Sequence, residues 1–262
     1  MLKTEPNCYV DGIPSVFIEG DKQKNIIVMT HGILGSRNEY LDTFARIAEK
    51  LEKDGIASIR FDFVGHGVSA GELDDFSLQS QISDLQTIID WVFEKGYQRI
   101  TLLGLSFGAP PAIVCAALND SIVQKCVLLA PVLDYRATFL YPSTSWGIAN
   151  FGIQKIVEGI NKGKLVLEED YYLSSKVLMD LLLVDIPSYS RMFETSCIIF
   201  HGKSDDMVPL SASRAFASSL KNVKLIEMER TEHGLTEVDD VAFTSDITLY
   251  NLNCLVEELK QS

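Results

Sequence analysis

Ser106 lies in a five-residue segment whose residue types and spacing are suited to nucleophilic catalysis. The segment 104–108 (GLSFG) follows an apolar, β-prone run at 100–103 and precedes an Ala-rich apolar run. This order predicts a strand, a sharp turn that carries one serine, and a buried helix. The two glycines are expected because the backbones of the strand and the helix pass too close to each other for side chains. The serine hydroxyl would stand at the tip of a sheet, above a helix N-terminus that favours a developing oxyanion. We therefore predict Ser106 as a nucleophile.

A second serine, Ser69, has the same glycine spacing in residues 67–71 (GVSAG). An acidic loop follows Ser69, whereas an apolar helix directly follows Ser106. Only the second context is typical of a strand–turn–helix nucleophile. We therefore prefer Ser106 over Ser69.

A serine hydroxyl needs a base that takes its proton, and the base must be oriented by a third group. The chain offers four histidines. His31 and His201 follow apolar strands and precede glycines, and His66 lies between two glycines. His233 lies in the loop after the last predicted strand, which is where an α/β fold of this kind supplies its base. We expect His233 to be the base, with the acid between Ser106 and His233 in the chain.

Two adjacent carboxylates in that interval, Asp205 and Asp206, follow an apolar strand. The acid has to accept the imidazole Nδ1–H and stabilise the imidazolium, without taking up the proton itself. Glu232, beside His233, is interpreted as a solvated loop charge. The residues by themselves leave the acid open between Asp205 and Asp206.

Two backbone N–H groups are expected to bind the oxyanion. They belong to Phe107, directly after the nucleophile, and to Ile33, directly after the pair His31 and Gly32. Losing one such donor typically costs about 3 to 4 kcal/mol in the transition state. The alternative interpretation of residues 31–35 is a plain turn.

These groups must be positioned by a regular scaffold, and the chain shows one. Strand-like and helix-like runs alternate, which predicts an α/β fold with a mostly parallel central sheet and helices on both faces. Ligands of such sheets bind at the carboxyl ends of the strands, and His31, His66 and Ser106 all fall just past such an end. We expect strands at 8–19, 25–30, 57–63, 100–103, 125–130, 195–200 and 223–228, and helices at 40–51, 78–92, 109–118, 211–220 and 239–259.

The alternation is lost between Pro131 and Thr195. We interpret residues 133–193 as a cap (lid) folded over the strand ends, and residues 1–132 and 194–262 as the core. The segment is rich in aromatic side chains, which could line an apolar substrate pocket or simply attach the cap to the core. These aromatic residues are Tyr135, Phe139, Tyr141, Trp146, Phe151, Tyr171, Tyr172 and Tyr189.

The composition excludes several classes of partner. The chain of 262 residues has a formal net charge of −13 and a pI of about 4.7. Such a charge opposes sequence-independent nucleic-acid binding and attraction to anionic membranes. The uncharged run at 100–119 has the length of a membrane span, but Gly, Ser and paired Pro break it into strand, turn and helix. We expect no membrane span.

The five cysteines are scattered, with no C-x-x-C pair and no histidine at metal-ligand spacing. Together with an N-terminus that lacks the apolar core of a signal peptide, they predict buried free thiols and a cytoplasmic location. We expect no metal site, and we leave the oligomeric state open between a monomer and a homodimer.

Taken together, these motifs resemble the α/β-hydrolase superfamily over essentially the whole chain. The resemblance is carried by His31-Gly32, residues 62–69 (DFVGHGVS), residues 104–108, and the spacing Gly202-x-x-Asp205-x-x-Val208-Pro209 before His233. The chain is similar to bacterial intracellular carboxylesterases, including cinnamoyl (feruloyl) esterases, and to monoacylglycerol lipases and serine-aminopeptidase-like hydrolases.

The resemblance implies that Asp205 is the acid, that Ser69 is structural and that residues 133–193 are the lid. Two features depart from many relatives: Leu105 stands where they have histidine, and Ala-Pro-Pro at 109–111 replaces their small residues.

We therefore expect a serine carboxylesterase with a Ser-His-Asp triad that needs no cofactor. It would act on small-molecule esters with small to medium acyl or aryl-acyl groups, such as cinnamoyl-type esters, through an acyl-enzyme on Ser106. The alternatives are a thioesterase, an aminopeptidase and a non-catalytic ligand-binding relic of the fold. An aminopeptidase needs a carboxylate in the cap for the substrate ammonium, and five are available: Glu158, Glu168, Glu169, Asp170 and Asp180.

Overall fold

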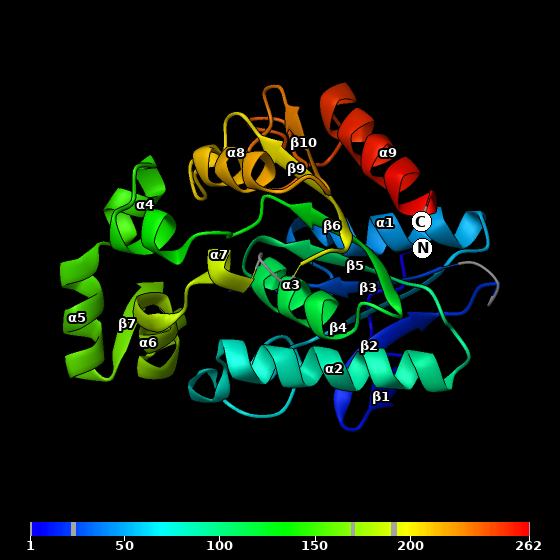
Figure 1. The fold of residues 1–262 in the computed structure, drawn as a ribbon, viewed down its shortest axis with the longest axis horizontal. Helices are drawn as coiled ribbons and strands as arrows, with labels where there is room; N and C mark the ends of the chain where they lie inside the picture. Colours follow the sequence, from blue (N-terminus) through cyan, green and yellow to red (C-terminus); the bar gives the residue numbers. More distant parts are fainter. Residues whose placement is uncertain (1, 22–24, 169–170, 190–192, 262) are drawn as a thin grey trace.

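The computed structural model describes residues 2–21, 25–168, 171–189 and 193–261. Within these ranges, eight strands form a central sheet in the order β1-β2-β4-β3-β5-β6-β9-β10 (Figure 1). The strands from β4 to β10 in this order run parallel to one another, whereas β2 pairs antiparallel with β4 and β1 pairs antiparallel with β2. The strands span Cys8–Val10 (β1), Ile13–Ile18 (β2), Ile26–Thr30 (β3), Ala57–Phe61 (β4), Ile100–Leu105 (β5), Val123–Leu129 (β6), Ser196–Gly202 (β9) and Val223–Met228 (β10).

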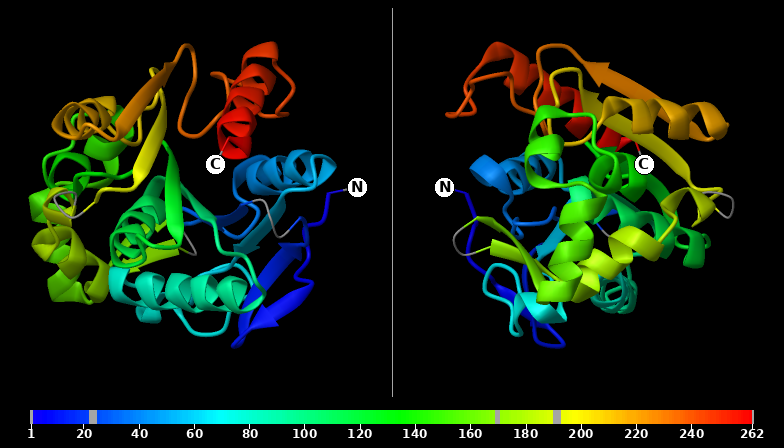
Figure 2. Two further views of the ribbon diagram at one scale, coloured as in Figure 1. Left: turned by 45° about the vertical axis from the view of Figure 1, so that its right-hand side comes forward. Right: turned by 90° about the vertical axis from the view of Figure 1, so that its left-hand side faces the viewer.

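Helices cover both faces of this sheet, which confirms the predicted architecture (Figure 2). One face packs against α1 (Thr43–Lys53) and α9 (Asp246–Lys260), and the other against α2 (Leu78–Glu94), α3 (Ala109–Leu118) and α8 (Leu210–Ser219). In α1, α2, α8 and α9 the apolar side chains recur at helical spacing and form one stripe that faces the sheet, whereas α3 is buried along the whole of residues 109–116. Each buried Leu, Ile, Val or Phe side chain contributes about 1.5–3 kcal/mol.

Two expected elements differ from the structure. The strand expected at 8–19 is a hairpin, because Asp11 and Gly12 both have positive φ values (47° and 88°) and form a two-residue turn between β1 and β2. The helix expected at 239–259 begins only at Asp246. The Asp240 carboxylate accepts hydrogen bonds from the backbone N–H groups of Thr244 and Ser245, which holds the preceding residues in a loop.

Residues 133–193 lie between β6 and β9 in the chain, and the described part, residues 133–168 and 171–189, lies together at one end of the molecule (Figure 1, left). Aromatic contacts join this segment to the turn after β5. The ring of Tyr135 stacks on Phe107 with centroids 5.4 Å apart, and Phe139 contacts both Phe107 and Phe151. The segment contains a helical turn at Arg136–Leu140, α4 (Ser145–Asn150), α5 (Ile153–Lys162), β7 (Lys164–Glu168), β8 (Tyr171–Ser174), α6 (Ser175–Leu183) and α7 (Ile186–Tyr189).

The cysteine expectation is confirmed only in part. The described cysteines form no disulfide, but Cys8 and Cys254 are partly exposed, whereas Cys115, Cys126 and Cys197 are buried. Of the helices in the described ranges, none combines the length and the apolarity that crossing a membrane requires.

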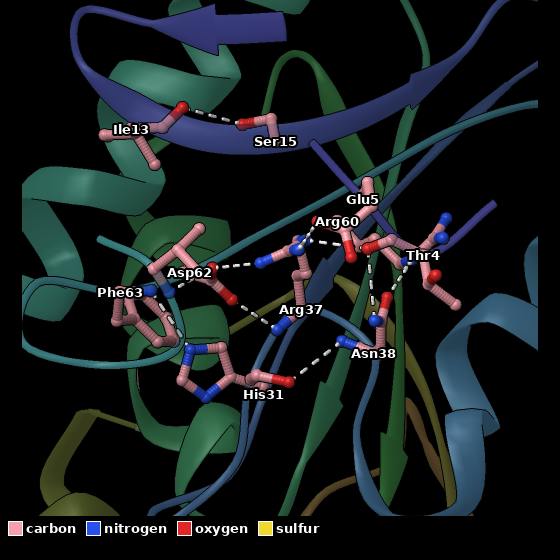
Figure 3. Close-up of polar contacts among 12 residues, drawn as sticks. Thr4, Glu5, Ile13, Ser15, His31, Arg37, Asn38, Arg60, Asp62 and Phe63 are labelled. Atoms are coloured by element: carbon pink, nitrogen blue, oxygen red, sulfur yellow. Dashed lines mark hydrogen bonds and ion pairs between the residues drawn. The ribbon is translucent and has the colours of Figure 1, made fainter. Parts of the chain in front are cut away.

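A buried ion pair fixes the loops that follow β3 and β4 (Figure 3). Asp62 is fully buried, and its carboxylate accepts from Nη1 of Arg37 at 2.5 Å, from the Arg37 backbone N–H at 2.7 Å and from the Val68 N–H at 3.0 Å. Arg37 Nε donates in turn to the carbonyl oxygen of Thr4. A Cβ on Gly67 would lie 2.4 Å from the Asp62 carboxylate, so the loop fits closely around this charge.

We expect Asp62→Asn to lower the free energy of unfolding by about 3–5 kcal/mol, because it leaves the buried Arg37 guanidinium with only the exposed carboxylate of Glu5, 3.6 Å away, as a counter-charge. Denaturation by guanidinium chloride measures this change. The control is Lys53→Ala, which removes an exposed pair with Glu49 and should cost less than about 0.5 kcal/mol. A loss at Asp62 no larger than the loss at Lys53 would contradict the prediction.

Candidate active site

The predicted strand, turn and helix around Ser106 are confirmed. Strand β5 ends one residue before Ser106, whose φ of 51° is rare for a residue with a side chain. A Cβ on Gly104 would lie 2.9 Å from the Cα of Ala109, and one on Gly108 would lie 2.1 Å from the carbonyl oxygen of Thr30. Only glycine fits at either position, so the turn brings Ser106 tightly over the start of α3.

The two expected oxyanion donors lie in turns on either side of Ser106. Phe107 belongs to the first turn of the helical segment, where backbone N–H groups lack an intrahelical acceptor. Ile33 lies in the turn Gly32–Gly35, closed by a hydrogen bond from the Gly35 N–H to the Gly32 carbonyl, with Leu34 at a φ of 66°. Among the described residues, the Ile33 N–H has no hydrogen-bond acceptor, so it remains available to a ligand.

His233 contacts Asp205 and not Asp206. Nδ1 of His233 lies 2.8 Å from Oδ2 of Asp205, whose side chain is fully buried, whereas Asp206 is exposed. The other oxygen of Asp205 accepts from the backbone N–H groups of Met207 and Val208, both at 2.9 Å. This carboxylate is therefore held rigidly, with one oxygen directed at the imidazole.

The electrostatics of the pair favour an imidazole that readily gains a proton. Burial alone would raise the pKa of Asp205, but its contacts with His233 and His201 outweigh burial and lower it well below the ordinary value. Burial alone would lower the pKa of His233, but the charges of Asp205, Glu39 and Asp206 raise it above its ordinary value. Such an arrangement stabilises the imidazolium that forms when a base accepts a proton.

The other three histidines support the structure. The ring of His31 is buried, and its Nε2 accepts from the Phe63 N–H at 3.0 Å; burial lowers its pKa to about 3. Burial also lowers the pKa of His66. His201 is buried beside Asp205, with Nδ1 2.8 Å from Oγ of Ser213 and Nε2 3.3 Å from the Asp205 carboxylate. His201 therefore helps to hold the acid, a role that its sequence context did not indicate.

Ser106 and His233 line the same cavity, which has a volume of about 610 Å³. No hydrogen bond joins the two side chains within the described ranges, and such catalytic contacts often tighten only with substrate bound. Tyr171 and Trp146 bring the 133–193 segment to the cavity wall. The lining residues are Gly32, Ile33, Leu34, Gly35, Ser36, Glu39, Tyr40, Gly67, Leu105, Ser106, Trp146, Tyr171, Met207 and His233.

Glu39 is the one carboxylate among these lining residues, and the sequence interpretation missed it. Glu39 stands in a polar loop, and no pattern among its neighbours in the sequence marks it as part of a functional site. Of the cap carboxylates considered for an aminopeptidase, Glu158 is exposed and Asp180 accepts from the Leu78 N–H, and neither lines the cavity. Glu169 and Asp170, together with the side chain of Glu168, lie outside the described residues.

Ser69 lies in a separate loop. Its backbone N–H donates to the His66 carbonyl at 2.9 Å, and it does not line the cavity. In the part of the chain that the structure describes, no group of three His, Cys, Asp or Glu side chains is placed to hold a metal ion.

Comparisons with known proteins agree with this fold. A family model described as serine aminopeptidase, S33, matches residues 21–171. An acyl transferase of Photobacterium leiognathi is 27% identical over 223 residues, covering 82% of this chain and 68% of the relative. The structure of Est1E from Butyrivibrio proteoclasticus with bound ferulic acid has a TM-score of 0.76 at 20% identity, covering 96% of both chains.

The monoacylglycerol lipase of Paleococcus ferrophilus has a TM-score of 0.67 at 17% identity, covering 94% of this chain and 98% of the lipase. The family model extends over more than half of the chain. The chain therefore belongs to the serine aminopeptidase S33 family of α/β-hydrolases.

Proposed function

We propose that this chain hydrolyses carboxylic esters through an acyl-enzyme on Ser106. Ser106 Oγ attacks the ester carbonyl carbon while His233 takes its proton, and the N–H groups of Ile33 and Phe107 bind the oxyanion. His233 then passes the proton to the leaving alcohol. Water, deprotonated by His233, attacks the acyl-enzyme and releases the acid and free Ser106. Asp205 keeps His233 in the required tautomer.

One arrangement carries this proposal. Ser106, on a strained turn, shares a cavity with His233, and His233 is hydrogen-bonded to the buried Asp205 at 2.8 Å. A nucleophile, a base and an orienting acid in this chain order are typical of hydrolases with this fold. The fold shared with a monoacylglycerol lipase supports the same reaction class.

We further propose that residues 133–193 form a cap on the core of residues 1–132 and 194–262, and that the cap helps to select the acyl group. Trp146 and Tyr171 of this segment share the cavity wall with Leu105 and Met207. Apolar walls of this kind suit small to medium acyl or aryl-acyl groups. The ferulic acid bound in Est1E supports the aryl-acyl possibility.

A second candidate is acyl transfer to an acceptor other than water. The relative from Photobacterium leiognathi is named an acyl transferase. The same acyl-enzyme on Ser106 would serve this reaction, since only the attacking group changes. A thioester, the substrate of the thioesterase alternative, would donate its acyl group to Ser106 in the same first step.

Hydrolysis of p-nitrophenyl esters by the purified protein tests the ester proposal. We expect turnover, with at least about a tenfold range in kcat/KM across acetyl, butyryl, decanoyl and cinnamoyl groups, because a largely apolar cavity wall discriminates acyl size. Butyryl-coenzyme A and alanine p-nitroanilide represent the thioesterase and aminopeptidase alternatives. Equal rates across the acyl series would contradict the cap proposal. Turnover of the thioester or the anilide without any ester would contradict the ester proposal.

A further inference from the structure

Glu39 lines the same cavity as Ser106 and His233, although no catalytic step has been assigned to its carboxyl group. It accepts hydrogen bonds from the backbone N–H of Gly32 and, at 3.3 Å, from its neighbour Tyr40. A Cβ on Gly32 would lie 3.1 Å from the Cβ of Ser106 and 3.5 Å from Oε1 of Glu39. The carboxyl group and the nucleophile therefore both border the space beside the Cα of Gly32, where a side chain would stand.

The backbone of Glu39 is strained. Its φ of 61° and ψ of 171° fall in a region that is almost restricted to glycine, at a cost of about 1–3 kcal/mol. Leu41 and Asp42 also have positive φ values. Hydrogen bonds from the Glu39 N–H to the Ser36 carbonyl (2.9 Å) and from the Asp42 N–H to the Glu39 carbonyl (3.1 Å) hold this conformation. The fold thus retains strain at the residue that brings its carboxyl group to Gly32.

Glu39 and His233 line the same cavity, so the charge of Glu39 acts on the imidazole. Three carboxylates interact with this imidazole: Asp205 through a hydrogen bond, and Glu39 and Asp206 through their charges. Burial raises the pKa of Glu39 to about 7, against the opposing effects of the Gly32 and Tyr40 N–H groups and of His233. Glu39 therefore gains its charge in the pH range in which a histidine becomes an effective base.

We propose that Glu39 is a positioning residue, whose carboxyl group fixes the peptide that leads to the Ile33 oxyanion donor and whose charge stabilises the imidazolium of His233. The role in catalysis rests on the proposed esterase reaction. Because the Gly32 N–H is held by Glu39, the next peptide, which carries the Ile33 N–H, keeps its orientation toward the oxyanion.

Two substitutions separate the hydrogen bond from the charge. Glu39→Ala removes both, and we expect kcat to fall by about 10- to 100-fold with KM changed by less than about threefold, since a misplaced oxyanion donor affects mainly the transition state. Glu39→Gln keeps an oxygen that accepts from Gly32, so its loss of kcat should be smaller. The matched control is Glu49→Gln on α1, which removes an exposed carboxylate paired with Lys53.

The pH profile gives a readout that a merely structural role would not move. Without the charge of Glu39, the pKa of His233 falls, so neutral imidazole persists to lower pH. The acidic limb of kcat/KM in Glu39→Gln should therefore move down by about half a pH unit relative to wild type. An unmoved limb, an increase in kcat, or equal losses in both Glu39 variants would overturn the proposal.

An NMR titration of the His233 imidazole, assigned with a His233→Ala variant, tests the charge effect without any substrate. We expect the His233 pKa to be lower in Glu39→Gln than in wild type and in Glu49→Gln. If this shift occurs while no ester is hydrolysed, the proposed function fails but the coupling of Glu39 to His233 stands. If the pKa of His233 is the same in all three proteins, the inference fails, whatever the enzyme hydrolyses.

Discussion

The Ser106→Ala variant is expected to lose at least about a thousandfold in kcat for ester hydrolysis, because no acyl-enzyme can form without the hydroxyl group. KM should change little, since a small side chain at the turn contributes little to binding the acyl group. The measurement is steady-state hydrolysis of the best p-nitrophenyl ester by wild type and variant. Residual activity within about tenfold of wild type would contradict Ser106 as the nucleophile.

Ser69→Ala is the matched control, because Ser69 has the same glycine spacing but lies in the loop after β4 and does not line the cavity. We expect it to retain wild-type turnover. A fluorophosphonate probe adds a second readout: it should label wild type and Ser69→Ala covalently, but not Ser106→Ala. Labelling that survives in Ser106→Ala and disappears in Ser69→Ala would assign the nucleophile to Ser69.

Asp205→Asn is expected to reduce kcat by about 10³- to 10⁴-fold. The asparagine amide has almost the same shape, but with one oxygen held by the Met207 and Val208 N–H groups, its NH₂ group would face Nδ1 of His233. His233 would then carry its proton on Nε2, the atom that must accept the proton from Ser106. Steady-state kinetics near the wild-type pH optimum measure the loss.

Asp206→Asn is the matched control, since Asp206 is the exposed neighbour and reaches His233 only through its charge. We expect a loss of less than about threefold, because an exposed charge is screened by water and salt. If instead Asp206→Asn abolishes activity and Asp205→Asn does not, the acid has been assigned to the wrong residue. Circular dichroism of both variants checks that each one folds.

Two of the structural differences from expectation have distinct physical causes. The sequence does contain a hairpin signal at Asp11 and Gly12, because such a dipeptide readily adopts the two positive φ values of a tight turn. The start of α9 had no comparable signal. The Asp240 side chain binds the backbone N–H groups of Thr244 and Ser245, and an apolar periodicity cannot report a side chain that competes locally with the helix.

The sequence by itself determined the alternation of strands and helices from residue 26 to residue 129 and the turn at Ser106, because these depend on neighbouring residues. Gly104 and Gly108 are needed within a few residues of Ser106, and the apolar runs on both sides set the strand and the helix. It also placed His233 in a loop after the last strand, where a parallel sheet gathers residues from distant parts of the chain.

Only the tertiary structure decided which groups meet. The contact of His233 with Asp205, the support from His201 and the place of Glu39 beside Gly32 all depend on how loops from separate strands pack against one another. Glu39 shows the reason most clearly. A strained backbone is stable only when the surrounding contacts hold it, and those contacts come from the folded chain rather than from adjacent residues.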